Sequence, residues 1–314
     1  MSRGIIRQTV ILFAVAVLIA AAAGGSFDPV LADPPSPKQT AKDSPQKPPS
    51  QEAVLAKDTI VLADVPYGKD DKQRLDVYAP KGVKHAPVVV FVHGGEWTRG
   101  DKSAVSFKPK FLNENGIVFV SINYRLTPAV THPAHANDVA TSVRWVRDHA
   151  AEFGGDGRKI VLMGHSAGCH LVTLVALDRR YLGRVNLRPA DLRGVVAWSG
   201  GAYDLVAKVE AGGFYADYIK KTFGDSENAW RDASPVAHVQ DASPLPAFLF
   251  VSVERGNASH KAAQRLAGLI QDAQGKSTST LLEGRDHTSA NHLLGAPGDK
   301  TGSILLEFIR EVTK

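Results

Sequence analysis

Residues 159–168 read KIVLMGHSAG and join a short apolar run to a serine flanked by two glycines. The run Lys159–Met163 is typical of a strand that is buried on both faces. A helix is expected from about Ala167 to Asp178. Because a turn this sharp between a strand and a helix leaves no room for side chains beside its central residue, Gly164 and Gly168 fit the G-x-S-x-G pattern. We therefore predict that Ser166 is presented at the carboxyl end of a buried strand.

The same alternation of apolar runs and helical stretches extends along the chain in both directions. Seven further strands are expected, at residues 59–62, 74–78, 87–92, 117–122, 194–198, 247–253 and 279–282. Helices are expected up to about residue 115 and at residues 135–152, 260–273 and 302–312. Residues 202–245 interrupt the alternation and predict an insertion after the sixth strand. The pattern predicts an α/β fold, with a mostly parallel twisted sheet and helices on both faces.

Composition excludes several classes of protein. The 314 residues include 44% hydrophobic residues, 37 Lys and Arg, and 32 Asp and Glu, for a net charge of +5. This is a globular composition, and no block of basic residues predicts nucleic-acid binding. The single cysteine, Cys169, excludes an intrachain disulfide and a cysteine-rich metal site, and we expect it to be a small buried side chain.

The N-terminal region differs from the rest of the chain. Two arginines precede the apolar run Val10–Ala23, which is shorter than the roughly 20 residues of a membrane span and suits a secretory signal. We expect a signal peptide at residues 1–32, a Pro- and Lys-rich tether at 33–56 and a catalytic domain at 57–314. Export to the periplasm or the medium follows, without stable membrane association once the signal is cleaved. An uncleaved N-terminal membrane anchor stays open.

A second glycine motif follows the expected strand at 87–92. Residues 93–97 read HGGEW, and glycines allow main-chain N–H groups to approach a bound group closely. In a strand–turn–helix site of this kind, one oxyanion donor is the N–H after the serine and another comes from the loop after the third strand. The candidates are Ala167 together with Gly94 or Gly95.

These motifs, in this order, resemble the α/β-hydrolase superfamily. The resemblance rests on HGGEW, on Asn123-Tyr124-Arg125-Leu126, on GHSAG and on a late histidine, and covers about Leu62 to Val312. It is closest to carboxylesterases related to hormone-sensitive lipase and to kynurenine formamidase. Many esterases have a third glycine where this chain has Glu96, whereas the formamidase-like branch tends toward H-G-G-x-W. The resemblance implies a Ser-His-acid triad and requires neither a metal nor an organic cofactor.

The family order places the acid and then the histidine after the serine. His287 lies between the strand expected at 279–282 and the final helix, in a segment that reads as a loop, and is the expected general base. His292 is the alternative, whereas His260 is expected on a helix surface.

The acid departs from the family pattern. The family usually has an Asp just past the strand that corresponds to 247–253, and this chain has Glu254 there. Glutamate can orient and stabilise an imidazole as aspartate does, so Glu254 is the expected acid. Asp204 is the alternative acid, although a helix cap is the more probable role for it.

The resemblance implies a serine hydrolase that cleaves carboxylic esters, expected to carry short acyl chains, through an acyl-enzyme. An arylformamidase-type amide hydrolase, an acetyl or feruloyl esterase on plant polysaccharide and a non-catalytic binding protein of the same fold stay open. The expected partner is a small-molecule ester, and the sequence assigns no physiological substrate or oligomeric state. Four aromatic residues are candidates for the substrate pocket, with local core as an equal alternative: Trp97, Phe214, Tyr215 and Tyr218.

Overall fold

The computed structural model describes residues 55–241, 244–253 and 257–314. The expected signal peptide, nearly all of the expected tether and Glu254 lie outside these ranges. Within the described ranges, the helices are all too short or too polar to cross a membrane.

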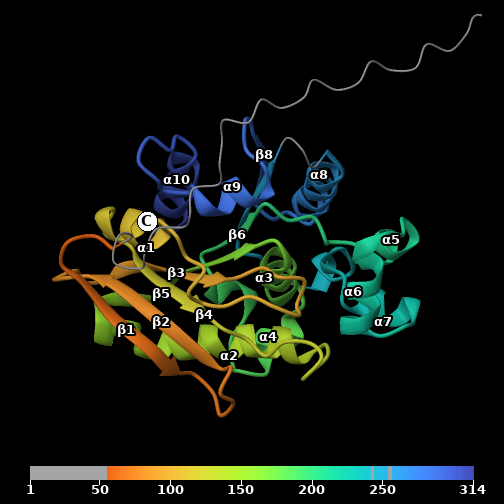
Figure 1. The fold of residues 1–314 in the computed structure, drawn as a ribbon, viewed down its shortest axis with the longest axis horizontal. Coiled ribbons are helices and arrows are strands. Elements are labelled where there is room, and N and C mark those ends of the chain that lie inside the picture. Colours follow the sequence, from red (N-terminus) through yellow and green to blue (C-terminus); the bar gives the residue numbers. More distant parts are fainter. Residues whose placement is uncertain (1–54, 242–243, 254–256) are drawn as a thin grey trace, which may run out of the picture. The chain divides into compact units, whose positions relative to one another are not determined.

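An eight-stranded sheet runs through the described domain (Figure 1). The strands lie in the order β1-β2-β4-β3-β5-β6-β7-β8. β2 pairs antiparallel with β1 and β4, and all other neighbours are parallel. The strands are β1 (Thr59–Pro66), β2 (Arg74–Pro80), β3 (Ala86–Val92), β4 (Val118–Ile122), β5 (Gly155–His165), β6 (Gly194–Trp198), β7 (Ala247–Val253) and β8 (Ser277–Leu282). The predicted mostly parallel α/β sheet is confirmed.

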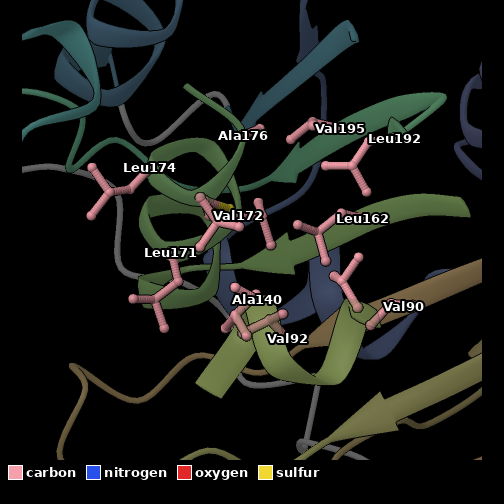
Figure 2. Close-up of a cluster of buried hydrophobic side chains, with 14 of the residues drawn as sticks. Val90, Val92, Ala140, Leu162, Leu171, Val172, Leu174, Ala176, Leu192 and Val195 are labelled. Atoms are coloured by element: carbon pink, nitrogen blue, oxygen red, sulfur yellow. The ribbon is translucent and has the colours of Figure 1, made fainter. Parts of the chain in front are cut away.

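Helices cover both faces of this sheet because its central strands are apolar on both sides. In β3, Val88, Val90 and Val92 belong to one buried cluster, and Val89 and Phe91 to another. The first cluster also contains side chains of several helices, three of which lie against the sheet, and Figure 2 shows part of it between two of these three and the sheet. These helices are α2 (Ala134–His149), α3 (Ala167–Leu177) and α8 (Asn257–Asp272). The second cluster includes side chains of α1 (Lys108–Glu114) and α10 (Gly302–Val312).

The predicted insertion after the sixth strand is confirmed. Between β6 and β7 it forms α5 (Leu205–Glu210), α6 (Phe214–Phe223) and α7 (Glu227–Asp232), followed by two short 3-10 turns. These helices lie together beside the sheet (Figure 1). In α6, the buried residues Ala216, Ile219 and Phe223 are three or four positions apart, which gives the helix one apolar face.

Two short helices were not expected from the sequence. α4 (Arg179–Gly183) follows α3, and α9 (His287–His292) occupies the segment that was expected to be a loop. Local polar contacts explain both helices. The Asp178 side chain accepts from the N–H of Arg180, and the Asp286 side chain accepts from the N–H of Ser289. His287 is therefore the first residue of a capped helix.

Candidate active site

The turn around Ser166 has the predicted strand–turn–helix form. Ser166 follows β5 directly, precedes α3 and has φ 55° and ψ −119°. A non-glycine residue rarely adopts a positive φ, so the turn stores strain at this serine. A Cβ on Gly164 would lie 2.3 Å from the carbonyl carbon of Gly168, and a Cβ on Gly168 would lie 2.1 Å from the oxygen of Val92. Both flanking glycines are thus required by close main-chain contacts.

Two cavities meet at Ser166 and His287, which line both of them. The insertion cavity, about 360 Å³, extends toward α5 and α6. It is also lined by Ala167, Ser199, Gly200, Gly201, Ala202, Lys208, Tyr215, Ser252, Val253, Ser259, Asp286 and Thr288. The loop cavity, about 280 Å³, lies on the side of the HGGEW loop, where Gly94, Gly95, Glu96 and Arg99 line it. A molecule bound at Ser166 could therefore extend into two separate spaces.

The three expected oxyanion donors lie around the serine. A Cβ on Gly94 would lie 2.7 Å from the Cβ of Ser166, so only a glycine allows the loop to come this close. Gly95 has φ +111°, in the region that favours glycine. Within the described ranges, no protein acceptor takes a hydrogen bond from the N–H of Gly94, Gly95 or Ala167. These main-chain donors are thus available to a bound oxyanion.

His287 is held in place by its ring and by its main chain. Its Nδ1 lies 2.9 Å from the Oγ of Ser199, and its carbonyl oxygen accepts a hydrogen bond of 3.1 Å from Nε2 of His165. The two imidazole rings are 4.6 Å apart. Burial lowers the pKa of His287 below its ordinary value, against the opposing effect of the carboxylates of Glu96 and Asp286. At neutral pH the ring is therefore neutral and able to accept a proton.

The described contacts include no hydrogen bond between Ser166 and His287. Catalytic hydrogen bonds are often long or poorly aligned before substrate binds. The lack of one here therefore agrees with Ser166 as a nucleophile and His287 as its base. The alternative base, His292, is exposed at the other end of α9, and His260 lies on α8. Neither of these histidines lines the two cavities.

The far end of α9 is fixed from inside the protein. Nε1 of Trp198 donates to the carbonyl oxygen of Ala290 at 2.8 Å, and Nζ of Lys108 donates to that of Asn291 at 2.8 Å. Lys108 is fully buried beside the ring of Phe91, and burial lowers its pKa to about 7. These contacts anchor the short helix that carries His287.

The structure describes one of the two candidates for the acid of the expected triad. Glu254 lies outside the described residues, so its assignment stays a prediction. The Asp204 side chain caps α5 by accepting from the N–H of Ala207 at 3.1 Å, and it pairs with Arg265 at 2.8 Å. The cap is confirmed, and Asp204 is not among the carboxylates that act on His287. Its contacts therefore do not support the alternative of Asp204 as the acid.

Of the four aromatic residues proposed for the substrate pocket, only Tyr215 lines a cavity. The proposal is wrong for Trp97, which is fully buried and packs edge-on against Phe223 at 5.0 Å. Phe214, which is 65% exposed, and Tyr218, which packs against the core, line neither of the two cavities. The side chains of α6 point to different sides, and only its face toward Ser166 forms a cavity wall.

Several polar residues of the site had not been singled out from the sequence. Ser199 directly follows β6, Ser252 is the second-last residue of the neighbouring strand β7, and Lys208 lies on α5. Their places at the ends of the strands at 194–198 and 247–253 could have indicated that both serines belong to the site, because parallel strands place their carboxyl ends at one edge of the sheet. Cys169 is buried, as expected, and burial raises the pKa of its thiol. The described residues contain no cluster of three or more His, Cys, Asp or Glu side chains that could hold a metal ion.

Solved structures with a similar fold are esterases. Esterase B from Lactobacillus rhamnosis superposes with a TM-score of 0.70, at 20% identity, over 84% of this chain and 90% of the esterase. EstE1, a thermophilic carboxylesterase from a metagenomic library, gives a TM-score of 0.65, also at 20% identity, over 84% and 93%. These likenesses confirm the α/β-hydrolase fold.

Relatives in sequence include esterases. A probable isoprenylcysteine alpha-carbonyl methylesterase from Arabidopsis thaliana is 30% identical over 243 residues, which are 73% of this chain and 51% of the relative. The esterase LipC from Mycobacterium tuberculosis is 31% identical over 231 residues, 70% of this chain and 56% of the relative. The chain thus spans little more than half the length of these relatives. The BD-FAE family model matches residues 75–260, well over half of the sequence, and the chain belongs to the BD-FAE family.

Proposed function

We propose that this protein is a serine hydrolase that cleaves carboxylic esters, expected to carry short acyl chains. One observation carries the proposal: Ser166 stands in a strained turn at the meeting point of two cavities, together with His287 and three unpaired main-chain N–H groups. The esterases among its relatives and its structural neighbours support the same activity. A binding protein would need neither the strain at the serine nor the donors around it.

The reaction follows from these positions. Oγ of Ser166 attacks the carbonyl carbon of the ester while Nε2 of His287 takes the hydroxyl proton. The N–H groups of Ala167 and of Gly94 or Gly95 stabilise the oxyanion of the tetrahedral intermediate. His287 then returns the proton to the leaving alcohol, and an acyl group remains on Ser166. Water attacks this acyl-enzyme with His287 again as the base, which releases the acid and restores Ser166.

Glu254 is the acid in this proposal. It directly follows Val253, which lines the insertion cavity together with His287. A carboxylate near this point would stabilise the imidazolium that forms when His287 takes the proton. The described carboxylates of Glu96 and Asp286 favour the same charged form of the ring.

The proposal is tested with 4-nitrophenyl acetate and butyrate and with a fluorophosphonate that labels activated serines. Ser166→Ala should lower kcat by at least about 10³-fold and abolish labelling, because no other group can form the acyl-enzyme. In the same assay, Glu254→Ala should lower kcat by about 10²-fold or more while the melting temperature stays close to that of the wild type.

The control is Ser303→Ala, which changes an exposed serine on α10 and should leave turnover and labelling unchanged. Retained hydrolysis in Ser166→Ala, or a fluorophosphonate adduct on another residue, would remove the proposal. Near-normal activity in Glu254→Ala would transfer the charge-stabilising role to Glu96 and Asp286.

A further inference from the structure

Ser166 and Ser199 occupy equivalent positions on neighbouring strands. β5 and β6 are parallel, and His165 pairs with Trp198 in their register, so each serine is the next residue after a paired position. Both serines have positive φ values, 55° for Ser166 and 61° for Ser199. The site therefore contains two strained serines side by side at the carboxyl edge of the sheet, and the established chemistry of the fold uses only one.

Ser199 is fixed by its surroundings. Ser199 is only 3% exposed, and its N–H donates to the carbonyl oxygen of Val251 at 2.7 Å. The next residue, Gly200, passes so close to α3 that a Cβ there would lie 2.4 Å from the Cβ of Cys169. Strain of this kind persists only where the surroundings over-determine the conformation, and it concentrates at functional sites.

The hydroxyl of Ser199 lies next to Nδ1 of His287, the ring nitrogen that takes no part in the proton transfer at Nε2. Oγ lies 2.9 Å from Nδ1. When the hydroxyl oxygen accepts from Nδ1–H, Nε2 carries the lone pair that a general base needs. The imidazolium also has a proton on Nδ1, so the same hydrogen bond persists after His287 has taken the proton from Ser166.

We propose that Ser199 is a positioning residue of this hydrolase, whose hydroxyl sets the tautomer and the orientation of His287. The inference rests on the proposed function and assigns the orientation of the imidazole and the stabilisation of its charge to different residues. In a Ser-His-Asp triad, one carboxylate both orients the imidazole and stabilises its charge. Here a neutral hydroxyl orients the ring, and carboxylates that act through space, those of Glu96 and Asp286 among the described residues, stabilise the charge.

The test compares Ser199 with a serine that lies outside both cavities. Ser279 lies in β8, is half-buried, lines neither cavity and has no hydrogen-bond partner for its hydroxyl among the described residues. Ser199→Ala should lower kcat about 10- to 100-fold with little change in KM, because a misplaced catalytic group costs about this much. Ser279→Ala should stay within about twofold of the wild type, since Ser279 lines neither cavity.

A second variant separates positioning from a merely structural role. Ser199→Asp keeps an oxygen acceptor for Nδ1 and adds a charge, and aspartate tolerates the positive φ. We expect it to recover at least part of the kcat lost in Ser199→Ala. The acidic limb in the pH dependence of kcat/KM, where activity rises as His287 loses its proton, should also move to higher pH, because a carboxylate favours the imidazolium.

Equal activity of Ser199→Ala and Ser279→Ala would overturn the role of Ser199, and so would a Ser199→Asp variant no more active than Ser199→Ala. Both results leave the proposed function intact as long as Ser166→Ala is inactive. If Ser166→Ala keeps its activity, the proposed function itself fails.

Discussion

Glycines around the nucleophile and serines beside it show what single residues contribute to this site. Gly94 and Gly168 allow main chain to pass within contact distance of Ser166 and of β3, respectively. Ser199 contributes a hydroxyl at the one nitrogen of His287 that the nucleophile does not use. In each case the residue acts through one short contact, so a change of one or two atoms is a sharp test.

Two glycine-to-alanine substitutions should have opposite effects on stability. A Cβ on Gly168 would lie 2.1 Å from the carbonyl oxygen of Val92, and such overpacking typically costs about 1–3 kcal/mol. Gly268→Ala, in the middle of α8, meets nothing within 4 Å and should stabilise the protein by roughly 0.5–1 kcal/mol. Urea unfolding measures both changes. A stabilised Gly168→Ala variant would contradict the geometry of the turn.

The helices of the insertion form one wall of the site. Tyr215 on α6 lines the insertion cavity. Burial raises its pKa, and an interaction with the Ser166 side chain offsets part of this rise. Its ring packs edge-on against Trp97 at 6.5 Å, which connects the wall to the HGGEW loop. The size of the space beside Ser166 is therefore set by an element that is separate from the sheet.

Truncation of this wall should change the preference for chain length. Tyr215→Ala should raise the ratio of kcat/KM for 4-nitrophenyl hexanoate to that for the acetate by about tenfold, because extra methylenes then find apolar space. Phe214→Ala is the matched control on the same helix, since Phe214 is exposed and lines neither cavity. An equal change of the ratio in both variants would argue against Tyr215 as the wall.

Two histidines, His132 and His170, link the insertion to the rest of the domain. Nε2 of His132 lies 3.0 Å from the hydroxyl of Tyr181, and Nε2 of His170 donates to the carbonyl oxygen of Ala233 at 2.8 Å. The ring of Phe223, from α6, lies 5.1 Å from both imidazoles. Burial lowers the pKa of His132 and His135 to about 4 and that of His170 to about 3.

The stability of the whole domain should therefore fall in mild acid. Between pH 6.5 and about 4, these histidines are protonated in the unfolded chain and neutral in the folded protein, so the unfolded state binds more protons. Each histidine then lowers the free energy of unfolding by at most about 1.4 kcal/mol for each pH unit of acidification. Stability is fully present above pH 6.5 and is lost as the pH falls toward 4.

Urea unfolding of the wild type and of His170→Gln at pH 7, 6, 5 and 4.5 measures this dependence. Glutamine can donate to the carbonyl oxygen of Ala233 but does not titrate, so the variant should have a shallower slope. His85→Asn changes an exposed histidine and should keep the wild-type slope. Identical slopes for all three proteins would show that the buried histidines do not control acid stability.

Local patterns were sufficient to predict much of the fold and part of the site. The apolar runs at 247–253 and 194–198 are strands with the predicted bounds, because strands buried on both faces need continuous apolar residues. The strand–turn–helix around Ser166 was predictable because adjacent residues make its contacts. The short helix α9 was missed because its stability comes from a cap and from anchors on Trp198 and Lys108, which are distant in sequence.

The sequence by itself determined the α/β class, the nucleophile turn, the HGGEW loop and the order of the reactive residues. All of these depend on neighbours along the chain. Only the tertiary structure decided that Ser199 meets His287, that Tyr215 rather than Trp97 or Phe214 lines the cavity, and that Asp204 pairs with Arg265. In each case, the parallel strand ends or the insertion bring together side chains that are tens of residues apart in the sequence. No local pattern encodes such contacts.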